Sequence, residues 1–521
     1  MLSLTAMAEV NYQVVPLPQS IVLDKSGNKT QLVKGQAVAY PAGNALMKRN
    51  AEFAREFLGL QPKEAAKKET APVVLTLGLQ SQNPDAYKIT VGKKGIEIQG
   101  ASESGVFYGI QTLRKSVAGE AGDTLSLPWA VVTAEPRFQY RGTMLDCARH
   151  FFPIEYIKTH IDILALHGIN KFHWHLTDDQ GWRFEVKSLP ELAQKGSRRP
   201  HTIIGSNVGL HETDNAIYDD TPEEGYYTQD QMREIVTYAA ERYITVIPEI
   251  DLPGHMVAAL SVYPELGCTG GPYEVLPYWG ISPDVLCAGN PKTLEFIKTV
   301  LGELCDVFPS KLIHIGGDES PRDNWKVCPK CQAKMKELKL DKEEQLQSYI
   351  TKEVEKFLST KGRQPIGWDE ILEGGISDNA VVMSWRGFNG GIEAARLHHH
   401  VIMAPTSHCY IDYYQLRNHD IQPHSIGGYV PLSKIYSLDP VPQELTPEES
   451  QYIMGAQCNL WTEYVLSPSH VQYMLLPRLA AMSEVQWMQP QDKNFEDFTR
   501  RLVPLENLYH QLGYKYCSAY E

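Results

Sequence analysis

The first quarter of the chain combines the alternating pattern of strands with the periodicity of helices. Residues 86–100, AYKITVGKKGIEIQG, alternate apolar and polar side chains on both sides of GKKG, which is typical of a β-hairpin. Residues 104–117, SGVFYGIQTLRKSV, have the pattern of a helix. We therefore expect a small α+β domain over residues 11–135, and two prolines in the stretch 127–140 mark its junction with the rest of the chain.

The pattern changes after this junction and then repeats. Apolar or β-branched runs end in polar residues, and amphipathic stretches such as 154–169 separate them. Eight strands that alternate with helices predict an α/β fold, a (β/α)8 TIM barrel over residues 137–521. The predicted strands cover residues 140–148, 171–178, 244–251, 312–319, 364–371, 380–387, 401–408 and 453–463.

Polar and aromatic residues gather where these strands end. In a TIM barrel the functional residues lie at the carboxyl ends of the strands. Seven of the eight predicted strands run into Asp, Glu, Trp or Arg there, and the strand at 401–408 runs into HCYIDYY just beyond it. The candidate site residues are Arg149, Asp178, Asp179, His255, Asp318, Glu319, Trp368, Trp385, Tyr410, Asp412, Trp461 and Glu463.

Asp318 and Glu319 are adjacent carboxylates in LIHIGGDE. Most acidic pairs belong to solvated loops, but here an apolar run and two glycines precede the pair. Crowding and burial raise the pKa of a carboxyl, as an acid that acts near neutral pH requires. Carboxylates beside aromatic rings suit a sugar, whose CH faces stack on indole while its hydroxyls need acceptors. The pattern therefore favours cleavage of a glycosidic bond.

Two other classes of protein fit part of the pattern. A metal hydrolase could use His173 and His175, because His-x-His places two ring nitrogens on one strand face. The pair lies inside the predicted strand, however, and no further His cluster follows the fifth, sixth or eighth strand, which favours hydrogen-bonding roles in the barrel interior. A non-catalytic sugar-binding protein would need the aromatic residues but not the Asp–Glu pair.

The nine cysteines give no simple disulfide framework. Cys268 and Cys287 bracket a loop rich in Gly and Pro, and a disulfide there is compatible with an exported protein. Cys328 and Cys331 form VCPKC, but no second pair of this kind is present, which favours a dithiol or a local disulfide over zinc. The first residues, MLSLTAMAEV, look like the tail of a secretory signal, so we expect a periplasmic or secreted protein.

The composition excludes two kinds of partner. The chain has 521 residues, enough for more than one domain, and its 49 Lys and Arg against 63 Asp and Glu give a formal net charge of −14. No basic block stands out, which argues against a nucleic-acid partner. No apolar run reaches the length of a membrane span.

Seven motifs, met in order between about residues 141 and 463, resemble glycoside hydrolase family 20, the β-N-acetylhexosaminidases. They are RGTMLDCARHFFP, KFHWHLTDDQGWRFEVKSLPEL, IPEIDLPGH, HIGGDE, GWDEIL, SWRG and LWTE. The resemblance implies an exo-acting, retaining enzyme that releases terminal, non-reducing β-linked GlcNAc or GalNAc from oligosaccharides or glycoconjugates. No metal or organic cofactor is implied.

The resemblance also implies a division of labour between the adjacent carboxylates. In this family the 2-acetamido oxygen of the substrate attacks the anomeric carbon, which gives an oxazolinium intermediate. Glu319 would protonate the leaving oxygen and then activate water, while Asp318 would hold the acetamide N–H and stabilise the positive charge. Neighbours on an ideal strand point to opposite faces, so Gly316 and Gly317 are expected to let the backbone depart from strand geometry.

The other candidate residues are assigned by the same resemblance. The loops 201–226 and 267–287 are expected to decide which glycan is accepted. The implied contacts are Tyr410 with the acetamide oxygen, Trp368, Trp385 and Trp461 with the acetamide methyl group and the sugar face, Arg149 and Glu463 with the 3- and 4-hydroxyls, Asp412 with the 6-hydroxyl, and Asp178 and His255 with the back of Glu319.

Overall fold

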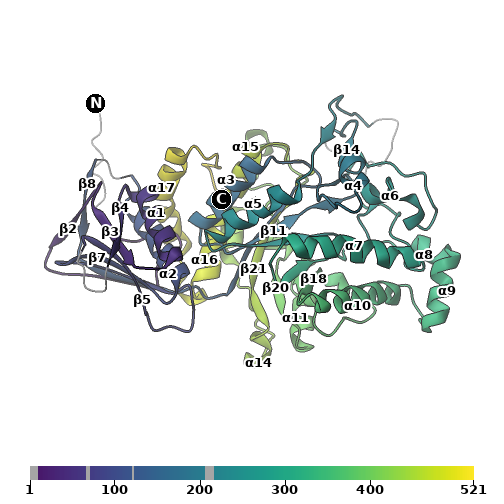
Figure 1. Ribbon diagram of the computed structural model, residues 1–521. Helices are drawn as coiled ribbons and strands as arrows, with labels where there is room; N and C mark the ends of the chain where they lie inside the picture. The colour runs from purple at the N-terminus through teal and green to yellow at the C-terminus, as the bar shows by residue number, and fades with distance from the viewer. Residues whose placement is uncertain (1–9, 66–70, 120–121, 206–215) are drawn as a thin grey trace.

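The computed structural model describes residues 10–65, 71–119, 122–205 and 216–521. A small domain built around an open sheet is followed by a barrel, and the long C-terminal helix α17 (Phe495–Leu512) lies between the two (Figure 1). The stretch interpreted as the tail of a secretory signal lies, except for its last residue, outside the described residues, as does 206–215 within the loop 201–226.

The small domain is the expected α+β structure. β6 (Tyr87–Gly92) and β7 (Gly95–Gly100) form the predicted hairpin, and α2 (Glu103–Ser116) is the predicted helix. The sheet has the order β1-β9-β6-β7-β5-β3-β4, and a separate antiparallel pair joins β2 to β8. The remaining elements are β1 (Ser20–Leu23), β2 (Lys29–Val33), β3 (Ala37–Pro41), α1 (Ala45–Leu58), β4 (Gln61–Ala65), β5 (Val73–Leu77), β8 (Thr124–Pro128) and β9 (Ala130–Ala134).

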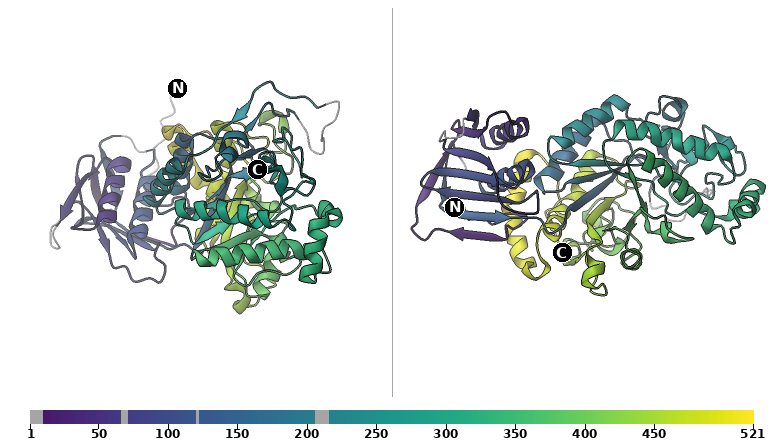
Figure 2. Two further views of the ribbon diagram at one scale, coloured as in Figure 1. Left: turned by 45° about the vertical axis from the view of Figure 1, so that its right-hand side comes forward. Right: turned by 60° about the horizontal axis from the view of Figure 1, so that its bottom comes forward.

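Helix α2 joins the small domain to the barrel. It packs against β7 and also contacts α17, which Figure 2 shows in yellow beside the small domain. Most residues of α2 are buried. Its Lys115 ammonium donates hydrogen bonds to the carbonyls of Val15, at 2.7 Å, and Leu166, at 3.1 Å. Because Leu166 belongs to the barrel part of the chain, these bonds tie the two domains together.

The second part is a closed barrel of eight parallel strands, as predicted. Every strand ends earlier than the sequence pattern predicts, so most of the candidate site residues lie in the loops after the strands, and Trp368 is the last residue of its strand. The strands are β10 (Tyr140–Asp146), β11 (Lys171–His175), β16 (Thr245–Glu249), β17 (Leu312–His314), β18 (Gln364–Trp368), β19 (Val381–Ser384), β20 (Val401–Met403) and β21 (Ile453–Leu460).

Amphipathic helices surround the barrel and bury its outer face. The stretch 154–169 becomes α3 (Ile154–Leu166), which ends just before Gly168 at φ 68°. Among the described residues no helix is both long and apolar enough to cross a bilayer. The other long helices are α5 (Gln229–Ala240), α7 (Pro291–Val307), α9 (Pro329–Leu338), α10 (Glu344–Thr360) and α16 (Arg478–Trp487).

Short elements occupy the loops between strands and helices. They matter because several of them carry residues of the site or lie directly beneath it. The short helices are α4 (Glu191–Lys195), α6 (Val257–Leu260), α8 (Asp323–Val327), α11 (Asn389–Arg396), α12 (Thr406–Cys409), α13 (Leu432–Ser437), α14 (Pro447–Ser450) and α15 (Pro468–Leu475). The short strands are β12 (Thr177–Asp178), β13 (Gly181–Trp182), β14 (Arg198–Arg199) and β15 (Glu223–Glu224).

Candidate active site

A cavity of about 280 Å³ opens where the barrel strands end. The residues around it come from the loops after six different strands, so the closed barrel brings together positions far apart in the chain. Nine of the eleven residues assigned roles from the sequence line this cavity: Arg149, His255, Asp318, Glu319, Trp385, Tyr410, Asp412, Trp461 and Glu463. The other two, Asp178 and Trp368, are buried behind its wall.

The turn after β17 brings both adjacent carboxylates into the cavity. Gly316 and Gly317 have φ values of 65° and 100°, so the backbone leaves strand geometry as expected. A Cβ atom on Gly316 would come within 1.7 Å of an oxygen of Asp251, which excludes any other residue there. The Asp318 side chain is 11% exposed, whereas the Glu319 side chain is 36% exposed. The two carboxylates therefore meet different environments in one cavity.

The buried environment of Asp318 changes its pKa. Burial, aided by the charges of Glu249 and Glu319, raises its pKa to about 6, although His255 opposes the shift. Its neighbour Asp251 is fully buried, and burial together with the charge of Asp318 raises the pKa of Asp251 well above its usual range. Carboxyl oxygens of the two residues lie within 4.8 Å of each other, so ionisation of one disfavours ionisation of the other.

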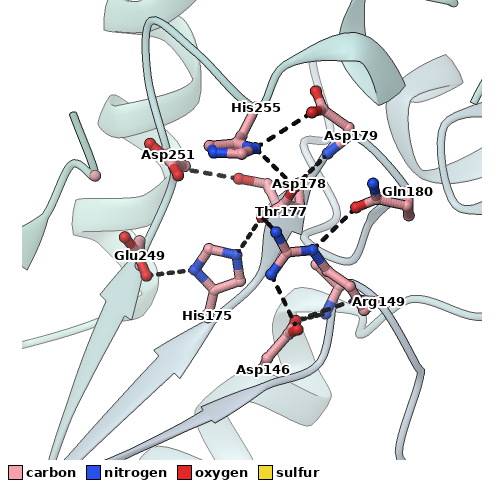
Figure 3. A network of polar contacts seen from close by, with 12 residues as sticks. Asp146, Arg149, His175, Thr177, Asp178, Asp179, Gln180, Glu249, Asp251 and His255 are labelled. Atoms are coloured by element: carbon pink, nitrogen blue, oxygen red, sulfur yellow. Dashed lines mark hydrogen bonds and ion pairs between the residues drawn. The ribbon is translucent and has the colours of Figure 1, made fainter. Parts of the chain in front are cut away.

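His255 lies between Asp318 and Glu319 and a second acidic group, Asp178 and Asp179, which Figure 3 shows beside its ring. Its Nδ1 lies 3.2 Å from oxygens of both Asp178 and Asp179. Its Nε2 lies 3.8 Å from Asp318 and 3.6 Å from Glu319. Burial alone would lower the pKa of His255, but the charge of Asp178 and the hydrogen bonds raise it well above its usual range. A positively charged imidazolium therefore faces both carboxylates.

Arg149 lies on the opposite side of Asp178 (Figure 3). Its guanidinium is 3.0 Å from Asp178, 3.2 Å from Asp146 and 3.9 Å from Glu463. Burial would raise the pKa of Asp178, but Arg149 and His255 outweigh it and lower the pKa. Asp178 does not reach the cavity; it holds Arg149 and His255, the two cationic residues that do.

Aromatic and acidic side chains complete the wall. The Trp385 and Tyr410 rings lie 6.1 Å apart at 22°, and the Trp385 indole N–H donates to Glu370 at 2.9 Å. Burial raises the pKa of Tyr410 well above its usual range, so its hydroxyl remains a donor. Burial also raises the pKa of Asp412 and of Glu463.

The predicted contact of Trp368 with the sugar is not supported by its position. Trp368 is 1% exposed and is not among the described residues that line the cavity. Its indole N–H donates to Glu249 at 3.0 Å, which turns the ring into the barrel, and its centroid lies 5.9 Å from that of Trp461. Trp368 therefore supports the wall from behind.

The two histidines considered as metal ligands hydrogen-bond inside the barrel. His173 lies 2.8 Å from Glu249 through Nε2 and receives a 3.0 Å hydrogen bond from Gln457 at Nδ1. His175 contacts Glu249 through Nδ1 and lies 2.9 Å from Asp178 through Nε2. Every ring nitrogen of the pair thus has a protein partner, which fits the hydrogen-bonding interpretation.

Sequence reasoning missed several residues that shape the site. Asp251 lies in IPEIDLPGH, at the end of a predicted strand, so the rule about strand ends could have selected it with His255. Trp279, Gly280 and Ile281 line the cavity from the loop 267–287, which was expected to matter but offered no pattern that singles them out. Tyr413, Ile426 and Tyr464 complete the described lining.

Comparison with known proteins agrees with this geometry. Residues 138–490 match the sequence model for "Glycosyl hydrolase family 20, catalytic domain", and residues 11–133 match the one for "domain 2" of that family. A β-hexosaminidase of Porphyromonas gingivalis is 45% identical over 425 residues, which are 80% of this chain and 52% of that protein. One of Vibrio furnissii is 39% identical over 411 residues, 76% of this chain and 64% of that protein.

Solved structures extend the likeness to the fold. The β-N-acetylhexosaminidase from Bacteroides fragilis has a TM-score of 0.82 at 28% identity, with 97% of each chain covered. The exo-β-N-acetylglucosaminidase from Vibrio harveyi, solved with N-acetylglucosamine, has a TM-score of 0.83 at 30% identity and covers 98% of this chain and 79% of its own. The chain spans about half the length of the P. gingivalis relative. It belongs to glycosyl hydrolase family 20.

Proposed function

We propose that the protein is an exo-acting, retaining β-N-acetylhexosaminidase that removes terminal β-linked GlcNAc or GalNAc from oligosaccharides or glycoconjugates. The observation that carries the proposal is the pair Asp318 and Glu319, one buried and one partly exposed, in a single cavity walled by indole rings. The β-hexosaminidases to which the chain is similar support the same activity.

The proposed reaction uses the substrate's own acetamido group as nucleophile. Its carbonyl oxygen forms a bond to the anomeric carbon while the bond to the leaving oxygen breaks. Glu319, the more exposed carboxyl, gives its proton to the leaving oxygen and later takes one from the attacking water. Water opens the oxazolinium from the face that the leaving group vacated, so the product keeps the β configuration.

Asp318 suits the charge that builds during this reaction. Its carboxylate would accept a hydrogen bond from the acetamide N–H and so orient this group. The same carboxylate would lie beside the positive charge of the oxazolinium. Because burial raises the pKa of Asp318 to about 6, its ionised form is poorly stabilised in the empty site. A positive charge beside it relieves that cost, so the interaction is stronger in the charged transition state than in the bound substrate.

The cavity favours a terminal sugar. About 280 Å³ lies at the small end of the range for ligand sites, so we propose that one pyranose fills it. Arg149, Glu463 and Asp412 line the cavity; Arg149 and Glu463 would bind the 3- and 4-hydroxyls, and Asp412 the 6-hydroxyl. Tyr410, kept protonated by burial, would donate to the acetamide oxygen.

The proposed substrates are glycans met outside the cytoplasm. The first residues of the chain support export to the periplasm or the medium, because their apolar run ends in small residues. Attachment of the N-terminal sequence to a reporter enzyme that is active only after export tests this. An inactive reporter contradicts it.

Turnover of matched aryl glycosides tests the activity. Aryl β-N-acetylglucosaminide and β-N-acetylgalactosaminide should be hydrolysed, whereas the aryl β-glucoside, which lacks the internal nucleophile, should hardly react. A thiazoline analogue of the cyclised intermediate should inhibit competitively. Comparable rates on the glucoside would show an enzymic nucleophile instead, and tight sugar binding without turnover would show a sugar-binding protein.

A further inference from the structure

Four cysteines that are distant in sequence meet beside the active-site loops. Cys268 and Cys287 belong to the segment after β16, and Cys328 and Cys331 lie at the start of α9. All nine cysteines of the chain are unbridged in the structure. The four sulfurs lie within 4.8 Å of one another. No second C-x-x-C pair is present, but Cys268 and Cys287, which a long loop separates in the sequence, supply two further sulfurs to the same place.

The sulfur distances match a common tetrahedral centre. Sγ–Sγ separations are 3.8 Å for Cys268–Cys331, 3.7 Å for Cys287–Cys328 and 3.6 Å for Cys287–Cys331. Four thiolates at about 2.3 Å from a zinc ion lie about 3.8 Å apart. A disulfide would need about 2.05 Å. These three contacts involve all four sulfurs, so the group is a cluster rather than two separate pairs.

The backbone holds these sulfurs in place. An antiparallel bridge joins Gly267 to Leu286, and the Cys287 N–H donates to the Leu266 carbonyl at 2.7 Å, so the segments that carry Cys268 and Cys287 run side by side. The Thr293 hydroxyl donates to the Cys287 carbonyl at 2.8 Å, and the Asn290 N–H donates to the same carbonyl at 3.1 Å. These bonds fix the backbone at Cys287.

The contact between the two cysteine segments is too close for a side chain. A Cβ atom on Gly289 would come within 2.1 Å of the Lys330 carbonyl carbon. The Trp325 indole N–H also donates to the Leu286 carbonyl at 3.0 Å, so α8 is tied to the same loop. The close approach at Gly289 and the hydrogen bond from Trp325 therefore hold together the two segments that carry the four sulfurs.

We propose that Cys268, Cys287, Cys328 and Cys331 bind one structural Zn²⁺. Four thiolates fill a tetrahedral zinc ion and leave no open position, as structural sites require. Three of the four cysteines are buried and Cys268 is half-buried, which shields the site from solvent. None of the four is among the described residues that line the catalytic cavity.

The zinc ion would join two segments that shape the active site. The loop 267–287 carries Trp279 and Ile281 on the cavity wall. Cys328 follows α8, and α8 follows the turn that carries Asp318 and Glu319. Bound zinc therefore holds the wall of the cavity against the segment that leaves the catalytic turn, and it does so without taking part in the reaction.

Metal analysis of the purified full chain tests the proposal. Elemental analysis should find about one zinc ion per chain. Cys287→Ser and Cys328→Ser should lose the zinc and melt at a lower temperature. Cys305→Ser is the matched control, because Cys305 is also buried but lies on α7 outside the cluster, and it should keep the zinc.

A second measurement does not depend on folded variants. Titration of the parent protein with an organomercurial should release the zinc to a chromophoric chelator, and a cobalt-loaded protein should show the charge-transfer bands of tetrahedral thiolate coordination. Free thiols without metal, disulfides among the four cysteines, bound iron, or zinc retained by Cys287→Ser would each overturn the proposal. Zinc content is measured without substrate, so the result is independent of the proposed enzymatic function.

Discussion

Two groups of potential metal ligands lie near the same cavity, and they differ in what already occupies their donor atoms. In the barrel, Glu249 hydrogen-bonds to His173, His175 and the indole of Trp368 and lies 2.8 Å from Nδ1 of His314. In the cysteine cluster, the contacts described for the sulfurs are with one another. The ring nitrogens of His173 and His175 are all paired within the fold, although the buried Nε2 of His314 is not, whereas the four thiols are packed against one another.

The difference shows that residue type alone does not define a metal site. Buried polar groups are stable when every donor and acceptor is paired, and His173 and His175 meet that condition without a cation. Substitutions near the carboxylates should therefore change catalysis and leave the fold intact. Substitutions in the cysteine cluster should change stability and leave the chemistry intact.

The largest effect is expected from Glu319→Gln, which keeps the shape of the side chain but cannot supply a proton. Its loss of kcat on a natural disaccharide should be at least about 10²–10⁴-fold. The loss should be milder for an activated aryl glycoside, whose leaving group departs unaided. Asp318→Asn removes charge beside the oxazolinium instead, so it should slow good and poor leaving groups alike.

Steady-state kinetics over a series of leaving groups separates these roles, and circular dichroism checks that both variants fold. A deficit of Asp318→Asn that disappears with a good leaving group would assign the acid role to Asp318. Equal sensitivity to the leaving group in both variants would mean that the two roles cannot be divided in this way.

The pH dependence of kcat/KM should come next in size. Asp318 must be ionised to act, and burial raises its pKa to about 6. Activity is therefore present above this pH and falls as the pH drops through it, by about tenfold per unit once Asp318 is protonated. The residual activity of Asp318→Asn should lack this acidic limb. An unchanged limb in the variant would assign it to another group.

The fold and most of the residues that line the cavity could be predicted from the sequence, because both depend on the periodicity of apolar residues along the chain. Strand periodicity placed all eight barrel strands, and the rule about strand ends selected nine residues that line the cavity. The rotamer of Trp368 could not be predicted, because it depends on Glu249 from another strand. The cysteine cluster could not be predicted either, since it forms only when two loops after different strands meet.

Chelation should affect stability more than chemistry. Exhaustive EDTA should leave turnover intact at a moderate assay temperature, because the proposed reaction uses only carboxylates and the substrate's amide. Where zinc is removed, Tm should fall by roughly 5 °C or more, since a structural zinc contributes several kcal/mol to folding and each kcal/mol moves Tm by about 2–4 °C.

Thermal melts and rates measured on the same samples check this expectation, with Cys328→Ser as the comparison. The variant, already without zinc, should show no further change in Tm with EDTA. Loss of turnover in both proteins, restored by added zinc in both, would instead place a catalytic metal at His173 and His175.

The smallest effect is expected from Trp368→Phe. The indole N–H donates to buried Glu249, and a hydrogen bond to a charged group contributes about 1.5–3 kcal/mol. Because Glu249 keeps its three histidine partners, the loss of unfolding free energy should lie near the lower end of that range. The ring does not reach the cavity surface, so KM for the aryl N-acetylglucosaminide should stay close to that of the parent.

Denaturant melts measure the free energy of unfolding of Trp368→Phe, and initial rates measure its KM. Trp385→Phe, a substitution in the cavity wall, is the matched control and should raise KM. A steep rise in KM for Trp368→Phe at unchanged stability would show that Trp368 touches the sugar after all.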